Sequence, residues 1–283
     1  MNENSPQQTP AISSWLHDAT IELVGAGISS AKLDAELILA HTLARPRTYL
    51  HAHGDEPLTH RQHEIADARL RLRLERTPLA YIIGHKDFYG HRFKVTPSTL
   101  IPRPESEDMI DLLIEADRQT SLPLHGARRL VDVGTGSGCL GISAKLALPD
   151  LSVTLADISR HALTVAEQNA RALHADVTIL QSNLLSSYPF TAQYILANLP
   201  YVDRQWQRSP ETNYEPDLAL FADHEGLALI NKLLADAPAH LTSGGHVLIE
   251  ADQRQHDAII TTAKTHGLTL HARRGFILDF IYA

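Results

Sequence analysis

The chain has 283 residues, of which 43% are hydrophobic and 20% charged, with a net charge of −8. This composition excludes a disordered chain, and the length favours two unequal folded domains. A single cysteine, Cys139, excludes an internal disulfide framework and is typical of a reducing compartment. The polar N-terminus does not resemble a signal peptide, and no apolar run approaches the ~18 residues of a membrane span. We therefore expect a cytoplasmic protein without a membrane partner.

The negative charge is unevenly distributed. Acidic and basic side chains balance in residues 1–97, so the whole excess lies in residues 98–283. Phosphate-binding proteins usually carry a basic footprint, and we therefore expect no direct nucleic-acid partner. The 17 histidines are scattered, with no HExxH pattern and no cysteine partners, so no metal site is predicted.

Residues 1–80 show the pattern of helices. Three positions can cap helix N-termini: Ser13-Ser14, Ser29-Ser30 and Thr59. The third helix is expected to continue to Pro78, and its arginines alternate with leucines, which we interpret as a solvated helix face. We predict a small all-α domain over residues 1–80.

Residues 81–97 change character, because aromatic and β-branched side chains alternate with polar ones around Gly84 and Gly90. This pattern predicts a short β-hairpin that links two domains. Prolines 102 and 104 then hold residues 99–107 extended, and a helix is expected to begin near Glu105.

From residue 128 onward, apolar runs typical of strands alternate with helical stretches. The expected strands cover residues 128–134, 152–157, 177–183, 194–200, 246–251 and 275–283. Helices are expected at 162–173 and 227–237, between strands. Strands separated by helices predict a doubly wound α/β sheet with crossover connections, within a domain that spans residues 98–283.

The sequence VDVGTGSG, residues 131–138, runs from the first of these strands into a loop with three glycines. Gly134, Gly136 and Gly138 let the backbone turn sharply and approach a ligand closely, with Thr135 and Ser137 between them. Open α/β sheets bind ligands at the carboxyl ends of their strands. Nucleotide-binding dehydrogenases use a related turn, so the loop alone does not decide the cofactor.

The next two strands also end in polar residues. The carboxylate of Asp157 can accept hydrogen bonds from both hydroxyls of a ribose, or it can cap the helix that follows. The third strand ends in Asn183 and Leu184, where an amide can pair with an adenine edge and a leucine can pack on its ring. Asn183 can equally be a turn residue.

The fourth strand ends in Asn198, Leu199, Pro200 and Tyr201. Pro200 restricts Leu199 to an extended backbone, so the Leu199 carbonyl and the Asn198 side-chain oxygen can both accept from a nitrogen that carries two hydrogens. Tyr201 offers a flat face for a planar group. A primary amide fits this set, and so does the amine of adenine. An amide nitrogen is a poor nucleophile, and such a clamp aims its lone pair at a methyl donor. The plainer interpretation is that Asn198 forms a turn.

These segments together resemble the glutamine N5-methyltransferases that modify peptide-chain release factors. The resemblance covers nearly the whole chain and rests on PLAYIIG (78–84), TLIPRPESE (99–107), VDVGTGSG (131–138), NLPY (198–201), YEPDLALFADHEGL (214–227) and SGGHVLIEADQRQ (243–255). It implies a Rossmann-like class I methyltransferase domain that uses S-adenosylmethionine, preceded by the all-α domain and the hairpin. It further implies methylation of the glutamine in the GGQ motif of release factors.

The resemblance also implies roles for individual residues. The cofactor would contact residues 134–138, Asp157, Asn183, Leu184 and Asn198. Residues 198–201 would hold and activate the substrate glutamine, and the N-terminal helical domain would grip the release factor. This chain departs from the family's NPPY at Leu199, which keeps the carbonyl but loses stiffness, and it has Asn183 where the family often has an acid.

Three alternatives remain open. A related enzyme methylates a glutamine of a ribosomal protein, but the PRPE segment favours the release-factor group. Adenine-N6 methyltransferases of DNA or RNA use a similar clamp on a flipped base, against which the acidic second half counts. A module that binds a release factor without methylating it is the third alternative, which only Leu199 motivates.

Overall fold

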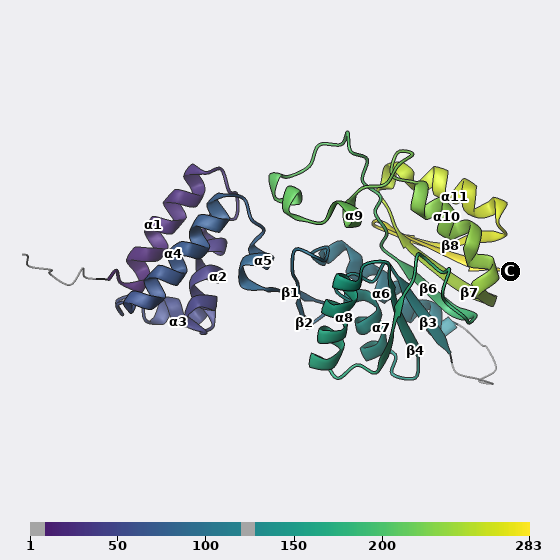
Figure 1. Ribbon diagram of the computed structural model, residues 1–283, viewed down its shortest axis with the longest axis horizontal. Coiled ribbons are helices and arrows are strands. Elements are labelled where there is room, and N and C mark those ends of the chain that lie inside the picture. The colour runs from purple at the N-terminus through teal and green to yellow at the C-terminus, as the bar shows by residue number, and fades with distance from the viewer. Residues whose placement is uncertain (1–8, 120–127) are drawn as a thin grey trace, which may run out of the picture. The chain divides into compact units, whose positions relative to one another are not determined.

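The structure, a computed structural model, describes residues 9–119 and 128–283. Residues 1–8, in which we expect no signal peptide, lie outside these ranges. The chain forms two compact units, coloured by residue number in Figure 1. One comprises the residues up to Gly84 together with Ser209–Tyr214, and the other comprises His85–Arg208 and Glu215–Ala283. None of the helices formed by the described residues has the length and apolar character needed to cross a bilayer.

The first unit is built from helices around an apolar core. Its helices are α1 (Ile12–Gly25), α2 (Ala31–Leu43), α3 (Arg47–Ala52), α4 (His60–Leu74) and α5 (Leu79–Ile83). Trp15 lies in the core, and its indole N–H donates to Asp67 of α4 over 2.7 Å. Thr59 caps α4 as predicted, in a capping box with Gln62.

The serine caps predicted for the first two helices are wrong. Helix α1 begins at Ile12, so Ser13 and Ser14 lie inside it. The backbone N–H groups of Ile12 and Ser13 donate instead to the carbonyls of Glu56 and Gly54, so a tertiary contact satisfies the helix end. Ser30 stands at the N-cap of α2, but its side chain makes no capping hydrogen bond.

A segment that is distant in sequence completes the helical unit. The short helix η2 (Pro210–Tyr214) carries Glu211, which accepts hydrogen bonds from Arg73 over 3.1 Å and from Arg76 over 3.3 Å. Arg73 also donates to Asp34 over 2.7 Å and is buried, so the interpretation of a fully solvated basic face is wrong at this residue. Burial acts to raise the pKa of Glu211, but hydrogen bonds, including those from the two arginines, lower it to about 2.

The hairpin consists of β1 (His85–Phe88) and β2 (His91–Lys94), with Gly90 at a φ of +75° in the turn. It is shorter than the predicted 81–97, because residues 79–83 form α5. Asn169 fastens it to the rest of the second unit: its side chain accepts from the Lys94 N–H over 2.7 Å and donates to the Lys94 carbonyl over 3.0 Å.

The second unit contains a seven-stranded sheet in the order β5-β4-β3-β6-β7-β9-β8. Its strands are β3 (Arg129–Val133), β4 (Ser152–Asp157), β5 (Val177–Gln181), β6 (Ala192–Ala197), β7 (Leu241–Glu250), β8 (Leu268–Arg274) and β9 (Ile277–Tyr282). Strands β3 to β7 pair in parallel, which confirms the doubly wound arrangement (Figure 1). Strands β8 and β9 are antiparallel. The sequence analysis did not predict β8, although its LTLHARR alternates apolar and polar residues as a strand with one solvated face does.

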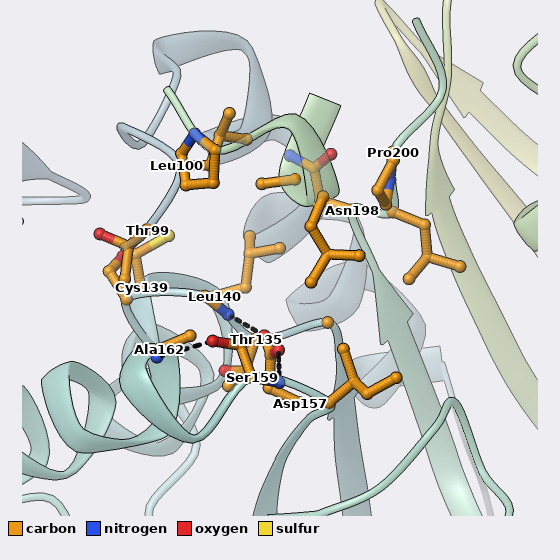
Figure 2. A pocket seen from close by; sticks show the side chains of 18 of the residues that line it. Thr99, Leu100, Thr135, Cys139, Leu140, Asp157, Ser159, Ala162, Asn198 and Pro200 are labelled. Atoms are coloured by element: carbon orange, nitrogen blue, oxygen red, sulfur yellow. Dashed lines mark hydrogen bonds between the residues drawn. The ribbon is translucent and has the colours of Figure 1, made fainter. Parts of the chain in front are cut away.

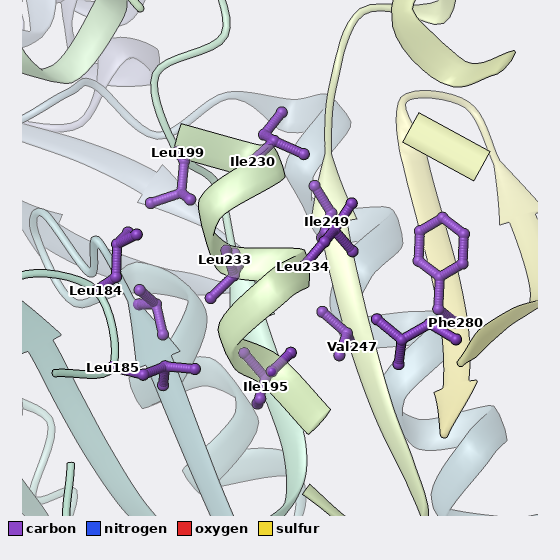
Figure 3. Close-up of a cluster of buried hydrophobic side chains, with 14 of the residues drawn as sticks. Leu184, Leu185, Ile195, Leu199, Ile230, Leu233, Leu234, Val247, Ile249 and Phe280 are labelled. Atoms are coloured by element: carbon purple, nitrogen blue, oxygen red, sulfur yellow. The ribbon is translucent and has the colours of Figure 1, made fainter. Parts of the chain in front are cut away.

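Helices cover both faces of this sheet. They are η1 (Pro104–Ser106), α6 (Glu107–Gln119), α7 (Cys139–Ala147), α8 (Arg160–Ala172), α9 (Asp217–Leu220), α10 (Ala228–Asp236), η3 (Ala237–His240), η4 (Gln253–Gln255) and α11 (His256–Thr265). Alternation along the strands gives two cores: Ile195 and Val247 face α10 (Figure 3), whereas Leu196 and Leu248 belong to the core that includes α6, α7 and α8.

The side chain of Asp132 joins β3 to the start of α7. It is fully buried, and its Oδ2 accepts from the Thr135 hydroxyl and from the Gly141 N–H, the latter over 2.9 Å. Burial raises the pKa of Asp132 to about 6 although both hydrogen bonds oppose the shift. This carboxylate therefore sets the shape of the glycine loop at an electrostatic cost.

Replacement of Gly141 by alanine should destabilise the protein. A Cβ there would lie 2.3 Å from Leu155 Cδ2 and 3.0 Å from Asp132 Cβ, whereas a Cβ on Gly25, at the end of α1, would meet nothing within 4 Å. We expect Gly141→Ala to lower the free energy of unfolding by about 1–3 kcal/mol and the control Gly25→Ala to leave it unchanged or raise it slightly. Urea unfolding of both variants measures this, and equal stabilities would contradict the tight packing.

The titration of Asp132 should be visible in the pH dependence of stability. With its pKa raised from 3.8 to about 6, the native state binds a proton that the unfolded state lacks between these values. The stability from this proton is present below about pH 4 and is lost as pH rises through about 6. The unfolding free energy of Asp132→Asn minus that of wild type should therefore rise by roughly 3 kcal/mol from about pH 3 to about pH 7. A pH-independent difference in urea unfolding would show that Asp132 does not titrate in this way.

Candidate functional site

A pocket opens at the carboxyl ends of the parallel strands in the second unit (Figure 2). The glycine loop after β3, Asp157 at the end of β4, residues 182–184 after β5 and residues 198–200 after β6 all line it. Residues 98–100, 102–103 and 106, which precede α6, line it as well. The structure thus brings together nearly all site residues predicted from the sequence. Two of the predicted residues, Gly138 and Tyr201, do not line the pocket.

The glycine loop has a left-handed backbone at each glycine, with φ of +72° at Gly134, +56° at Gly136 and +83° at Gly138. The N–H groups of Gly134 and Thr135 both donate to the Ala156 carbonyl, over 2.8 and 3.0 Å, so the loop bends across the end of β4. Gly138 caps α7 and does not line the pocket. Position 138 favours glycine because its backbone is left-handed, a conformation that residues with a side chain rarely adopt.

Asp157 holds the loop from the neighbouring strand. Its Oδ2 accepts from the Gly136 N–H over 2.9 Å, and its Oδ1 accepts from the Ser159 N–H over 2.8 Å. Burial raises the pKa of Asp157, and these backbone hydrogen bonds act in the opposite direction. The side-chain cap of α8 is Ser159, whose Oγ accepts from Ala162 over 3.2 Å. Each carboxylate oxygen of Asp157 can still accept a further hydrogen bond from a ligand.

Asn183 and Leu184 lie on the pocket wall, but not at the end of the strand as predicted, because β5 ends at Gln181. A turn follows the strand: the Ser182 hydroxyl accepts from the Ser187 N–H over 3.0 Å, and Leu184 has a φ of +52°. The turn brings the Leu184 side chain back toward the core beneath the pocket (Figure 3).

The segment after β6 forms the opposite part of the pocket wall. Asn198 donates from Nδ2 to the Ser106 hydroxyl over 3.2 Å. The Leu199 side chain is buried and packs beneath the glycine loop, where a Cβ on Gly134 would lie 2.9 Å from its Cδ2. Tyr201 turns toward the interior, and its hydroxyl donates to Glu250 over 3.2 Å. Burial and the nearby Glu250 carboxylate raise the pKa of Tyr201.

Several residues of the site were not identified from the sequence. The buried carboxylate of Glu215 accepts from the Ile101 N–H over 3.1 Å and from the guanidinium of Arg103, and so fixes the segment before α6. Ser106, which accepts from Asn198, donates in turn to the buried carboxylate of Glu250. Ser106 and Glu250 both lie in segments that carry the family resemblance, but sequence reasoning had no signal that these side chains meet.

Part of the pocket wall is apolar. It is formed by Cys139, Leu140, Ile158, Ala162 and Leu218. Ile158 is 49% exposed and Leu218 is 61% exposed. Burial raises the pKa of the Cys139 thiol to about 12, so it is not a thiolate nucleophile. A carboxylate beside exposed apolar side chains fits a ligand that combines a sugar with a planar base.

The described residues contain no group of three or more histidine, cysteine, aspartate or glutamate side chains that could hold a metal ion.

Comparisons with solved structures support the class of fold. A methyltransferase from Pyrococcus furiosus superposes with a TM-score of 0.50 at 17% identity, over 67% of this chain and 87% of that one. The hMettl16 catalytic domain, solved in complex with the MAT2A 3′UTR hairpin 6, gives a TM-score of 0.53 at 12% identity, over 80% of this chain and 83% of that one. At these identities the likeness concerns the fold, and it confirms the predicted Rossmann-like class I methyltransferase fold.

Sequence comparisons identify closer relatives. Residues 14–84 match the family model of the PrmC N-terminal domain, and residues 112–212 match that of the methyltransferase small domain. The release factor glutamine methyltransferase of Deinococcus radiodurans is 34% identical over 91% of this chain and 92% of its own length. The release factor glutamine methyltransferase of Bordetella pertussis is 34% identical over 86% of this chain and 90% of its own length. A bifunctional methyltransferase of Rickettsia bellii is 31% identical, and this chain spans 52% of its length. The chain therefore belongs to the release factor glutamine methyltransferase family.

Proposed function

We propose that this protein transfers a methyl group from S-adenosylmethionine to the side-chain amide nitrogen (N5) of the glutamine in the GGQ motif of peptide-chain release factors. The observation that carries the proposal is one pocket with two sides. Asp157 at the end of β4 and Asn198 after β6 lie on either side of the glycine loop after β3, because β3 stands between these two strands. A cofactor and an amide substrate can therefore meet in it.

The side of the pocket around Asp157 fits the nucleoside part of S-adenosylmethionine. Asp157 retains acceptor capacity for the ribose hydroxyls. Ile158 and Leu184 also line the pocket and offer apolar surface for the adenine. A Cβ on Gly136 would meet no side chain within 4 Å, so the loop backbone is open at this residue and can approach the rest of the cofactor. When bound, S-adenosylmethionine supplies an electrophilic methyl group.

The side of the pocket around Asn198 fits the amide. We infer that the Asn198 side-chain oxygen and the Leu199 carbonyl accept the two N–H bonds of the substrate amide and aim its nitrogen at the methyl group. A carbon–nitrogen bond forms as the carbon–sulfur bond breaks, and one amide proton then leaves to solvent. No base is needed before attack. Since position 199 contributes its carbonyl, leucine can replace the proline usual in this family.

We infer from the family resemblance that the N-terminal helical unit contributes to holding the release factor. Two arginines and the distant residue Glu211 order the end of α4 in that unit. This gives the unit a defined surface for a protein partner.

The proposed reaction can be tested directly. The purified protein is incubated with methyl-labelled S-adenosylmethionine and a release factor, beside a copy of the release factor whose GGQ glutamine is alanine. We expect label on the first and none on the second. If neither is labelled while calorimetry shows cofactor binding, the release-factor proposal is wrong, and ribosomal protein and adenine-containing DNA become the substrates to test.

The proposed role of Asn198 makes a separate prediction. Asn198→Ala should lower kcat for release-factor methylation by about 100-fold or more, because an acceptor that orients the nucleophile is lost. Its affinity for S-adenosylmethionine should stay within about threefold of wild type. Asn231→Ala is a matched control, because Asn231 lies in α10, does not line the pocket and has a side-chain oxygen without a hydrogen-bond partner. Equal losses of kcat and cofactor affinity in Asn198→Ala would rule out the assignment.

A further inference from the structure

We propose that Ser106 and Glu250 are positioning residues that fix the orientation of the Asn198 side-chain amide, with its oxygen facing the substrate. The proposal rests on the proposed function, because it concerns the acceptor that would hold the glutamine amide. It adds an explanation for how the site distinguishes glutamine from glutamate.

The three side chains come from separate parts of the second unit and form one chain of hydrogen bonds. Asn198, after β6, donates from Nδ2 to Ser106 Oγ over 3.2 Å. Ser106, at the end of η1, donates in turn to Oε2 of Glu250 at the end of β7. Ser106 and Glu250 are each only 2% exposed. Water therefore does not compete for these groups as it would at a surface.

The direction of each hydrogen bond follows from the number of protons available. An ionised carboxylate can only accept, and a hydroxyl has a single proton. Once Ser106 donates that proton to Glu250, its oxygen can only accept from Asn198. The NH₂ side of the Asn198 amide must then face Ser106. Its oxygen is left free as an acceptor.

Glu250 is held as an acceptor from both sides. Its second oxygen, Oε1, accepts from the Tyr201 hydroxyl over 3.2 Å. Burial raises the pKa of Glu250, but hydrogen bonding with Ser106, Tyr201 and Asn198 favours its charged form. Tyr201 thus acts on the same network, although it does not line the pocket.

The amide orientation has a consequence for specificity. With its oxygen toward the substrate, Asn198 accepts an N–H of glutamine and repels the carboxylate of glutamate. With the amide reversed, its NH₂ would face the NH₂ of glutamine and would instead attract glutamate. Discrimination between these side chains by a buried polar group is strong, because the wrong partner leaves the group unpaired.

The test uses two variants of nearly equal shape in the full-length protein. Ser106→Thr keeps the hydroxyl, whereas Ser106→Val replaces it with a methyl group. We expect Ser106→Val to lower kcat for the release-factor glutamine by about 10–100-fold and Ser106→Thr to stay within about threefold of wild type. Both should bind S-adenosylmethionine as wild type does. The orientation of the Asn198 amide is measured separately, by inhibition with a GGQ peptide and with a GGE peptide in which glutamate replaces the glutamine. In Ser106→Val the affinity for the GGE peptide divided by that for the GGQ peptide should rise about tenfold over wild type, and in Ser106→Thr this ratio should not change.

The outcomes separate the two proposals. If wild type labels the release factor but the valine and threonine variants match each other in kcat and in peptide preference, the positioning role is overturned while the proposed function stands. If wild type itself labels no release-factor glutamine, both are overturned. Should the added methyl group prevent folding of both variants, Ser106→Ala, which is smaller than serine, replaces them. Unchanged kcat and peptide preference in that variant overturn the role, and a loss of both supports it.

Discussion

Parallel pairing of β3 with β4 on one side and β6 on the other is the constraint on which the site depends. Val133 stands opposite Ala156 and Ala197, so the three strands end within one residue of the same level of the sheet. The residues that follow, Gly134, Asp157 and Asn198, therefore emerge at one edge although they are far apart in sequence. Crossover helices force this parallel order, and the two apolar cores hold it. The pocket, the glycine loop and the proposed amide clamp are consequences of this alignment.

Buried carboxylates then fix the conformation of the segments that line the pocket at that edge of the sheet. Asp132 shapes the glycine loop, Glu215 holds the segment before α6, and Glu250 lies behind Asn198. Each is at most 5% exposed, and burying a charge is costly unless hydrogen bonds compensate. Such groups seldom increase stability over apolar residues of similar size. We interpret them as devices that define geometry, and their location around the pocket agrees with that interpretation.

Four of the segments that carry the family resemblance line the pocket, although they are far apart in sequence. The IPRPE segment meets the YEPD segment through Glu215 and meets the strand that ends in Glu250 through Ser106. The amide of Gln255 donates to the carbonyls of Tyr201 and Glu225, over 2.9 and 2.7 Å, and so joins the NLPY segment and the end of the YEPD segment to the segment that contains Glu250. Side-chain hydrogen bonds therefore link four of the segments that carry the resemblance. Leu199 fits this network because its side chain fills the space beneath Gly134.

The sequence by itself determined the class of fold, the strands from β3 to β7, β9 and the glycine loop, because apolar runs and glycine spacing are local signals. It also identified Asp157 and Asn198, because both directly follow or end apolar strands. Only the tertiary structure decided that Tyr201 faces Glu250, that β8 forms an edge strand, that Ser209–Tyr214 joins the helical unit, and that Ser106 supports Asn198. Each of these depends on contacts between residues distant in sequence. Hydrogen bonds between side chains that are distant in sequence produce no repeating pattern of residues, so they can be identified only in the folded structure.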